Sequence, residues 1–120
     1  MWQGLDLRIA IIGCGDIGIR TAGLLIDSGH SVVGVRRNVS ALPDWLESIS
    51  ADVSQRQTLE FLSTESFDTI IYCLAAAGFN EAAYRSAYVT GVANTLDALD
   101  SQPRRFIFCL LYTSPSPRDS

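Results

Sequence analysis

The chain has 120 residues, of which 48% are hydrophobic and 18% charged, and its formal net charge is −4. This length predicts one domain at most, and the hydrophobic share is sufficient for a buried core, which excludes a disordered or fibrous chain. The negative charge argues against a nucleic-acid surface, and the apolar runs are too short for a membrane span. Three widely spaced cysteines argue against a disulfide framework or a zinc site, so we expect a cytoplasmic protein.

The first predicted element is a buried strand at Leu7–Ile12, which leads into a glycine-rich turn and then a helix at Ile17–Ser28. The turn has the spacing Gly-x-Gly-x-x-Gly. Gly13 would allow the tight turn, Gly15 the close approach of a pyrophosphate, and Gly18 the close packing of the helix on the strand. The pyrophosphate would face the N–H groups that begin the helix, so this pattern predicts a dinucleotide-binding loop.

Asp16 and Ile17 lie at the start of this helix and are counted among the expected cofactor-binding residues. An Asp16 carboxylate that pointed inward would repel phosphate, so we expect it to face solvent or to help cap the helix. Cys14 is interpreted as a small loop residue rather than a nucleophile. His30 follows the helix-ending Gly29 and is interpreted as a turn residue rather than a general base.

The second predicted strand, Ser31–Val35, is rich in β-branched residues and is followed by Arg36 and Arg37. An NAD-binding unit carries an acidic residue near this place, where it binds the ribose 2′-hydroxyl. Guanidinium groups would instead pair with a 2′-phosphate, so the two arginines favour NADP as the cofactor, with NAD as the alternative. The other interpretation is that both arginines belong to a solvated strand end.

Between the second and fourth strands the pattern is weaker. The segment Ser40–Ser50 is predicted as a short helix or an irregular connection, and Ile49–Val53 as a short third strand. Ser54 and Gln57 have the spacing of a capping box at the start of a helix that continues to Leu62.

Asp52 and Val53 come at the end of that third strand and are predicted to contact the cofactor. The Asp52 carboxylate could accept a hydrogen bond from an adenine amino group, or it could form the turn before the next helix. Phe67–Leu74 is predicted as a strong fourth strand. The small residues that follow would let a cofactor approach the backbone closely. The candidate contacts here are Leu74, Ala75 and Ala76.

A long helix is predicted at Asn80–Leu99, and a fifth apolar run at Arg105–Tyr112. The candidate inner positions of the helix are Ala83, Ala87, Val92, Leu96 and Leu99. Strands that alternate with helices in this way predict an α/β fold, a Rossmann-type doubly wound parallel sheet with helices on both faces. The ligand site of such a sheet lies at the carboxyl ends of its strands, where the glycine turn and the two arginines would meet.

Five segments, IIGCGDIG, GHSVVGVRRN, ADV, DTIIYCLAAAG and YVTGVANTLDAL, resemble the N-terminal half of short-chain dehydrogenases/reductases of the NAD-dependent epimerase/dehydratase group. That group usually carries Gly-x-x-Gly-x-x-Gly, whereas Ile12 stands in place of the first glycine, which points to the atypical, nucleoside-sugar-epimerase-like members. The resemblance implies a nicotinamide dinucleotide that exchanges hydride with a nucleotide sugar or a similar carbonyl or hydroxyl substrate. It is also compatible with a full-length parent protein that forms a homodimer.

The catalytic Tyr-x-x-x-Lys of that family cannot be written in this sequence, because all nine basic residues are arginines. The resemblance therefore implies a sheet truncated after about five strands, in which residues 1–109 are the N-terminal part of the NAD(P)-binding domain and the catalytic half is missing. Residues 110–120 are rich in serine and proline and are interpreted as a non-native or disordered tail. The alternatives are a non-catalytic dinucleotide-sensing module, the cofactor domain of a 6-phosphogluconate-type dehydrogenase, and a methyltransferase that binds S-adenosylmethionine.

Overall fold

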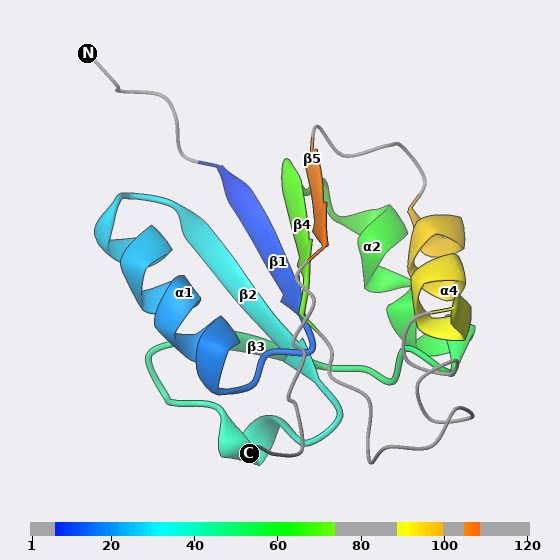
Figure 1. Cartoon of the computed structure of the whole chain (residues 1–120), viewed down its shortest axis with the longest axis horizontal. Helices are drawn as coiled ribbons and strands as arrows, with labels where there is room; N and C mark the ends of the chain where they lie inside the picture. The colour runs from blue at the N-terminus through cyan, green and yellow to red at the C-terminus, as the bar shows by residue number, and fades with distance from the viewer. Residues whose placement is uncertain (1–6, 74–88, 100–104, 109–120) are drawn as a thin grey trace, which may run out of the picture.

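A computed structural model describes residues 7–73, 89–99 and 105–108, which build one parallel sheet with helices on both faces (Figure 1). The strand order is β3-β2-β1-β4-β5, so the direction of winding reverses between β1 and β4. This is the doubly wound arrangement that the sequence predicts. The strands are β1 (Arg8–Ile12), β2 (Ser31–Arg36), β3 (Glu47–Ser50), β4 (Thr69–Tyr72) and β5 (Arg105–Phe108).

The alternation of side chains along β1 divides the core into two clusters. Ile9 and Ile11 pack with Ala22 of α1 (Asp16–Asp27), which covers one face of the sheet. Ala10 and Ile12 belong to the cluster on the other face, which α2 (Phe61–Thr64) and α4 (Gly91–Ala98) cover (Figure 1). Because β1 is buried on both faces, its sequence is a continuous apolar run rather than an alternating one.

Helix α1 begins and ends within one residue of its predicted bounds. Gly29 has φ 96° and its N–H donates to the Ile26 carbonyl at 2.9 Å, while the His30 N–H donates to the Leu25 carbonyl at 3.0 Å. These bonds form a Schellman motif, which requires the left-handed conformation that glycine adopts without strain. His30 is the expected turn residue, and its Nδ1 accepts a hydrogen bond from the Leu7 N–H at 3.1 Å.

The connection from β2 to β3 differs from the prediction. It contains a short 3₁₀ helix, η1 (Val39–Ala41), whose first turn is capped by the Asn38 side chain. Strand β3 then begins earlier than the predicted Ile49–Val53 and ends at Ser50. It lies at the edge of the sheet and pairs with β2 alone among the described strands, so its mostly exposed side chains do not form the apolar run by which a strand is recognised.

The predicted capping box at Ser54 and Gln57 is wrong. The backbone N–H and hydroxyl of Ser54 both donate to Asp52 Oδ1, at 3.0 and 2.8 Å, so Ser54 belongs to an Asx turn. The single predicted helix is replaced by a 3₁₀ helix, η2 (Arg56–Leu59), followed by the short α2.

The predicted inner face of the last helix is correct in part. Val92 is half-buried and Leu99 buried, but Leu96 is 41% exposed. The buried face of α4 consists instead of Gly91, Thr95 and Ala98. Thr95 can be buried because its hydroxyl donates to the Gly91 carbonyl at 2.7 Å, which satisfies the polar group inside the helix. The other two predicted inner positions, Ala83 and Ala87, lie outside the described residues.

Candidate cofactor-binding site

The glycine turn after β1 is fastened to the end of β2. Gly13 has φ 80°, as the tight turn requires. The N–H groups of Gly13 and Cys14 both donate to the Val35 carbonyl, at 2.8 and 3.0 Å, and the Gly15 N–H donates to the Gly13 carbonyl at 2.9 Å. The turn therefore has its own hydrogen bonds to the sheet and leads directly into α1.

The start of α1 presents backbone N–H groups at this turn. Gly15 is the N-cap residue, and within the described part of the chain no side chain caps the helix. The first N–H groups of any α-helix lack carbonyl partners in the helix itself, so they are available to an anion. A Cβ at Gly15 would meet nothing within 4 Å, and both Asp16 and Ile17 are exposed. Asp16 faces solvent, which is one of its two predicted roles.

Gly18 brings α1 close to β1, as predicted from the third glycine of the motif. A Cβ at this position would lie 3.0 Å from Cys14 Sγ and 3.2 Å from Ile11 Cγ2. Cys14 itself is completely buried, and this burial raises the pKa of its thiol, an effect that the nearby positive charge of Arg36 opposes. A buried thiol with a raised pKa is a packing residue rather than a nucleophile.

The two arginines at the end of β2 lie at the carboxyl edge of the sheet, the edge at which β1, β2 and β4 end. Arg36 is half-buried, and its Nη1 donates to the Cys14 carbonyl at 3.3 Å. Arg37 is exposed, and its backbone carbonyl accepts a hydrogen bond from the Ser50 hydroxyl at 2.8 Å. The sequence prediction treats the two as equivalent, whereas their surroundings differ.

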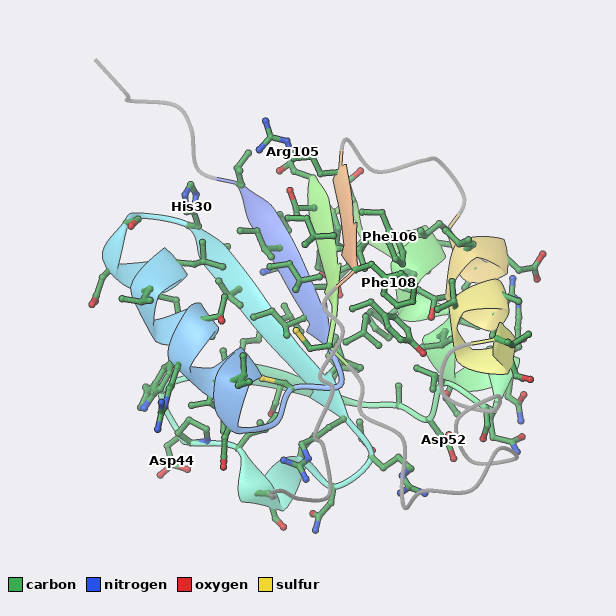
Figure 2. All side chains as sticks on the ribbon, viewed as in Figure 1. His30, Asp44, Asp52, Arg105, Phe106 and Phe108 are labelled. Atoms are coloured by element: carbon green, nitrogen blue, oxygen red, sulfur yellow. The ribbon has the colours of Figure 1, made fainter. Side chains whose placement is uncertain are left out.

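Asp52 lies on the same side of the molecule, away from His30 and Arg105 at the opposite edge (Figure 2). Its hydrogen bonds from Ser54 lower the pKa of its carboxyl group, and the positive charge of Arg37 contributes further. The turn-forming interpretation of Asp52 is therefore present in the structure, while its contact with an adenine stays a prediction. The Thr58 hydroxyl donates to the Asp52 carbonyl at 2.8 Å and so fixes the turn.

Val53 connects the carboxyl edge to α4. Its carbonyl accepts a hydrogen bond from Asn94 Nδ2 at 2.8 Å, and its Cγ2 would lie 2.9 Å from a Cβ on Gly91. Sequence reasoning did not single out Asn94 or Gly91, although a glycine at the start of a helical pattern is an indication of close packing. The remaining predicted contacts, Leu74, Ala75 and Ala76, lie outside the described residues.

Among residues 7–73, 89–99 and 105–108, no helix is long and apolar enough to cross a membrane. Within those same ranges, no three His, Cys, Asp or Glu side chains come together as a group that would hold a metal ion.

Residues 8–93 match the model of a protein family described as NADP oxidoreductase, coenzyme F420-dependent. The matched region begins with β1 and includes the glycine turn, both arginines and Asp52. The comparison with curated proteins found no match to the chain.

Among solved structures, a protein described as an NAD-dependent epimerase/dehydratase from Methylobacillus flagellatus is 33% identical, with a TM-score of 0.72 over 86% of this chain and 36% of that one. The enzyme WbmG of Bordetella bronchiseptica, solved in complex with NAD, is 22% identical, with a TM-score of 0.66 over 82% of this chain and 35% of that one. UDP-glucose 4-epimerase from Thermotoga maritima is 20% identical, with a TM-score of 0.72 over 85% and 37%.

The chain thus spans roughly a third of the length of these solved structures, between 35% and 37%. At their identities, the Bordetella and Thermotoga proteins support the Rossmann fold alone, while the Methylobacillus protein also supports the expected relationship to NAD-dependent epimerases and dehydratases. In each comparison with a solved structure the shared part is the Rossmann fold, and the family match covers the residues of the candidate site.

Proposed function

The chain belongs to the family described as NADP oxidoreductase, coenzyme F420-dependent, and from this membership we propose that its carboxyl edge binds the phosphates and adenosine of a nicotinamide dinucleotide. The cofactor, when bound, would supply hydride transfer. The proposed binding residues are those predicted from the sequence, and the last three lie outside the described residues: Gly13, Gly15, Asp16, Ile17, Gly18, Arg36, Arg37, Asp52, Val53, Leu74, Ala75 and Ala76.

The observation that carries this proposal is the fastened glycine turn. Gly13 has the left-handed φ of 80°, Gly15 has open space where a Cβ would be, and the first N–H groups of α1 follow directly. A pyrophosphate needs a backbone that it can approach closely and N–H groups that already point toward it. The residues present fit the phosphates of a dinucleotide.

We infer NADP rather than NAD as the preferred cofactor because two arginines, and no carboxylate, follow the second strand. A guanidinium forms charge-assisted hydrogen bonds with a phosphate, whereas the acidic residue usual in NAD-binding units would repel it. The Bordetella relative binds NAD. NAD is therefore the alternative that the experiment below distinguishes.

The parent activity that we propose is that of an epimerase, dehydratase or reductase acting on a nucleotide sugar or a similar carbonyl or hydroxyl substrate. The 33% identity to the Methylobacillus protein favours this class. In the proposed parent protein, residues 1–109 are the N-terminal part of the NAD(P)-binding domain, and the catalytic residues belong to a segment outside the present sequence. A homodimer of the parent remains part of this proposal. The second candidate is hydride exchange between NADP and coenzyme F420, which the description of the matching family favours.

Cofactor binding is tested by titrating the chain with NADPH and with NADH by calorimetry. We expect tighter binding of NADPH. In the double variant Arg36→Asp, Arg37→Ala the preference should disappear or reverse, because the positive charge at the 2′-phosphate is replaced by a negative one. The matched control is Arg105→Ala, which removes the same charge at the opposite edge of the sheet (Figure 2). A double variant that kept the preference for NADPH would show that the arginines are a solvated strand end.

A further inference from the structure

Arg36 and Arg37 are neighbours in sequence, but their guanidinium groups differ in burial and in hydrogen bonding. Arg36 is half-buried, and its Nη1 donates to the carbonyl of Cys14, a residue inside the glycine turn. Arg37 is exposed, and among the described residues no hydrogen bond or ion pair engages its guanidinium. Because the Arg36 guanidinium already binds the glycine turn and the Arg37 guanidinium does not, we expect the two to contribute differently to the binding of a phosphate.

Arg36 completes a set of bonds that holds the glycine turn to β2. The Val35 carbonyl accepts the N–H groups of Gly13 and Cys14, and the Arg36 side chain returns a donor to the Cys14 carbonyl. Two consecutive residues of β2 thus bind both the N–H and the C=O sides of the turn. This turn precedes the start of α1, where a pyrophosphate would lie. Removal of the Arg36 hydrogen bond should therefore weaken the binding of any dinucleotide, with or without a 2′-phosphate on its ribose.

Arg37 is suited to a ligand from outside the chain. Its backbone is fixed, because its carbonyl accepts the Ser50 hydroxyl hydrogen bond from β3, while its side chain extends into solvent. The Ser50 residue that donates to its carbonyl lies two positions before Asp52, so Arg37 lies on the side of the edge assigned to the adenosine, where its charge lowers the pKa of the Asp52 carboxyl. Since no carboxylate pairs with it in the described residues, a phosphate would not have to displace an existing ion pair.

We propose that Arg36 is a positioning residue that holds the glycine turn for both cofactors, and that Arg37 is the residue that selects the 2′-phosphate. This division rests on the proposed function, namely dinucleotide binding at the carboxyl edge. It assigns the preference for NADPH over NADH to the exposed arginine alone.

The test compares the single variants Arg36→Gln and Arg37→Gln with the control Arg105→Gln, all in the full chain. Dissociation constants for NADPH and NADH are measured by calorimetry, and the backbone amide resonances of Gly13 and Gly15 by NMR. In Arg37→Gln we expect NADPH to bind about 10- to 100-fold more weakly, as befits the loss of a charged hydrogen bond, and NADH to change less than about twofold. The two glycine resonances should stay in place.

In Arg36→Gln we expect both cofactors to bind about three- to tenfold more weakly, with the ratio of their dissociation constants unchanged, and the Gly13 and Gly15 resonances to shift. The division would be overturned if Arg36→Gln removed the preference for NADPH while Arg37→Gln kept it. It would also be overturned if the unmodified chain bound NADPH and NADH equally well, although dinucleotide binding would then stand. Absence of binding of either cofactor to the unmodified chain would contradict the proposed function itself.

Discussion

Gly18 and Gly23 lie on the same helix, but the space beside them is different. A Cβ on Gly18 would lie 3.0 Å from Cys14 Sγ, which is closer than ordinary van der Waals contact. A Cβ on Gly23 would meet only the Trp45 ring, at 3.7 Å, which is an ordinary contact. A single missing methyl group at Gly18 therefore sets how closely α1 approaches β1.

The first prediction concerns this pair of glycines. Gly18→Ala should lower the free energy of unfolding by about 1–3 kcal/mol, because the added methyl overpacks the contact between helix and strand. Gly23→Ala should leave it unchanged or raise it by up to about 1 kcal/mol, because alanine favours the helix. Urea denaturation measures both. Cys14→Ala combined with Gly18→Ala should recover part of the loss, and equal effects of the two glycine substitutions would contradict the packing argument.

The second prediction concerns pH. Hydrogen bonds from Ser54 lower the pKa of the folded Asp52 carboxyl below its unfolded value of about 3.9, so the charged form stabilises the fold above that pH. This contribution should decrease as the pH falls through the folded pKa. Asp52→Asn keeps an oxygen acceptor for Ser54 but removes the charge. It should be less stable than the unmodified chain at pH 7 and nearly equal to it at pH 2, by urea denaturation.

Asp44→Asn is the matched control for that experiment, since Asp44 is exposed and forms no hydrogen bond or ion pair within the described residues (Figure 2). It should reduce stability less than Asp52→Asn at pH 7. If the difference between Asp52→Asn and the unmodified chain were the same at both pH values, the Asx turn would not depend on the charge.

At the scale of elements, α4 is placed by small residues and by hydrogen bonds to the loop after β3. A Cβ on Gly91 would collide with Tyr72 Oη and would lie 2.9 Å from Val53 Cγ2. Asn94 donates to the Val53 carbonyl, and Arg56 Nε of η2 forms an ion pair with Asp97 at 2.7 Å. The helix is thus fixed at both its first turn and its outer face.

The third prediction follows from the Gly91 contact. Gly91→Ala should destabilise the fold by about 1–3 kcal/mol, because the added methyl would collide with the side chain of Tyr72, which is completely buried. Tyr72→Phe removes the hydroxyl that the new methyl would meet, so the double variant should recover part of the loss. Ala93→Ser, on the exposed side of α4, should change stability by less than about 0.5 kcal/mol. Thermal and urea denaturation provide the measurements, and a Gly91→Ala chain as stable as Ala93→Ser would refute the close contact.

Three of the strands that could be predicted from sequence are almost completely buried. Strands β1, β2 and β4 are apolar because helices or loops cover both of their faces. Strand β3 has an edge position and polar side chains, so its register depends on pairing with β2, which a local pattern does not contain. The same limit applies to Leu96, since the face that α4 buries is decided by the contact of Gly91 with Tyr72.

The candidate site shows the same limit. Glycine spacing alone predicts the turn, because the required φ and the close approach are local properties of residues 13–18. The bond between Arg36 and Cys14 joins residues 22 positions apart, so it depends on β1 lying beside β2. Sequence reasoning therefore identified both arginines but could not distinguish them.

For the molecule as a whole, the two edges of the strands carry charge differently. At the amino edge, Arg8 is neutralised by ion pairs with Glu47 and Glu65, at 3.2 and 2.7 Å. At the carboxyl edge, the Arg37 guanidinium forms no ion pair in the described residues. A chain with a net charge of −4 thus keeps a local positive charge where the anionic cofactor is proposed to bind.

The fourth prediction concerns the side edge of the sheet at β5, which pairs with β4 alone among the described strands. Phe106 packs against Tyr72, but Ile107 on the opposite face is 45% exposed. Such an apolar edge strand is a template for pairing with another chain. Ile107→Lys should reduce concentration-dependent association in analytical ultracentrifugation, and Leu24→Lys, on exposed α1, serves as the control. Equal association of the two variants would show that β5 is not the contact.

The hydrogen bonds from the glycine turn to Val35 also determine whether the turn is ordered before a cofactor binds. Because the turn is hydrogen-bonded to the central part of the sheet, it has its shape before any ligand is present, and binding need not supply the free energy to order it. Hydrogen exchange should show this directly. The amides of Gly13 and Cys14 should exchange slowly with or without NADPH, while those of Asp16 and Ile17 should exchange fast in the free chain and slowly in the complex.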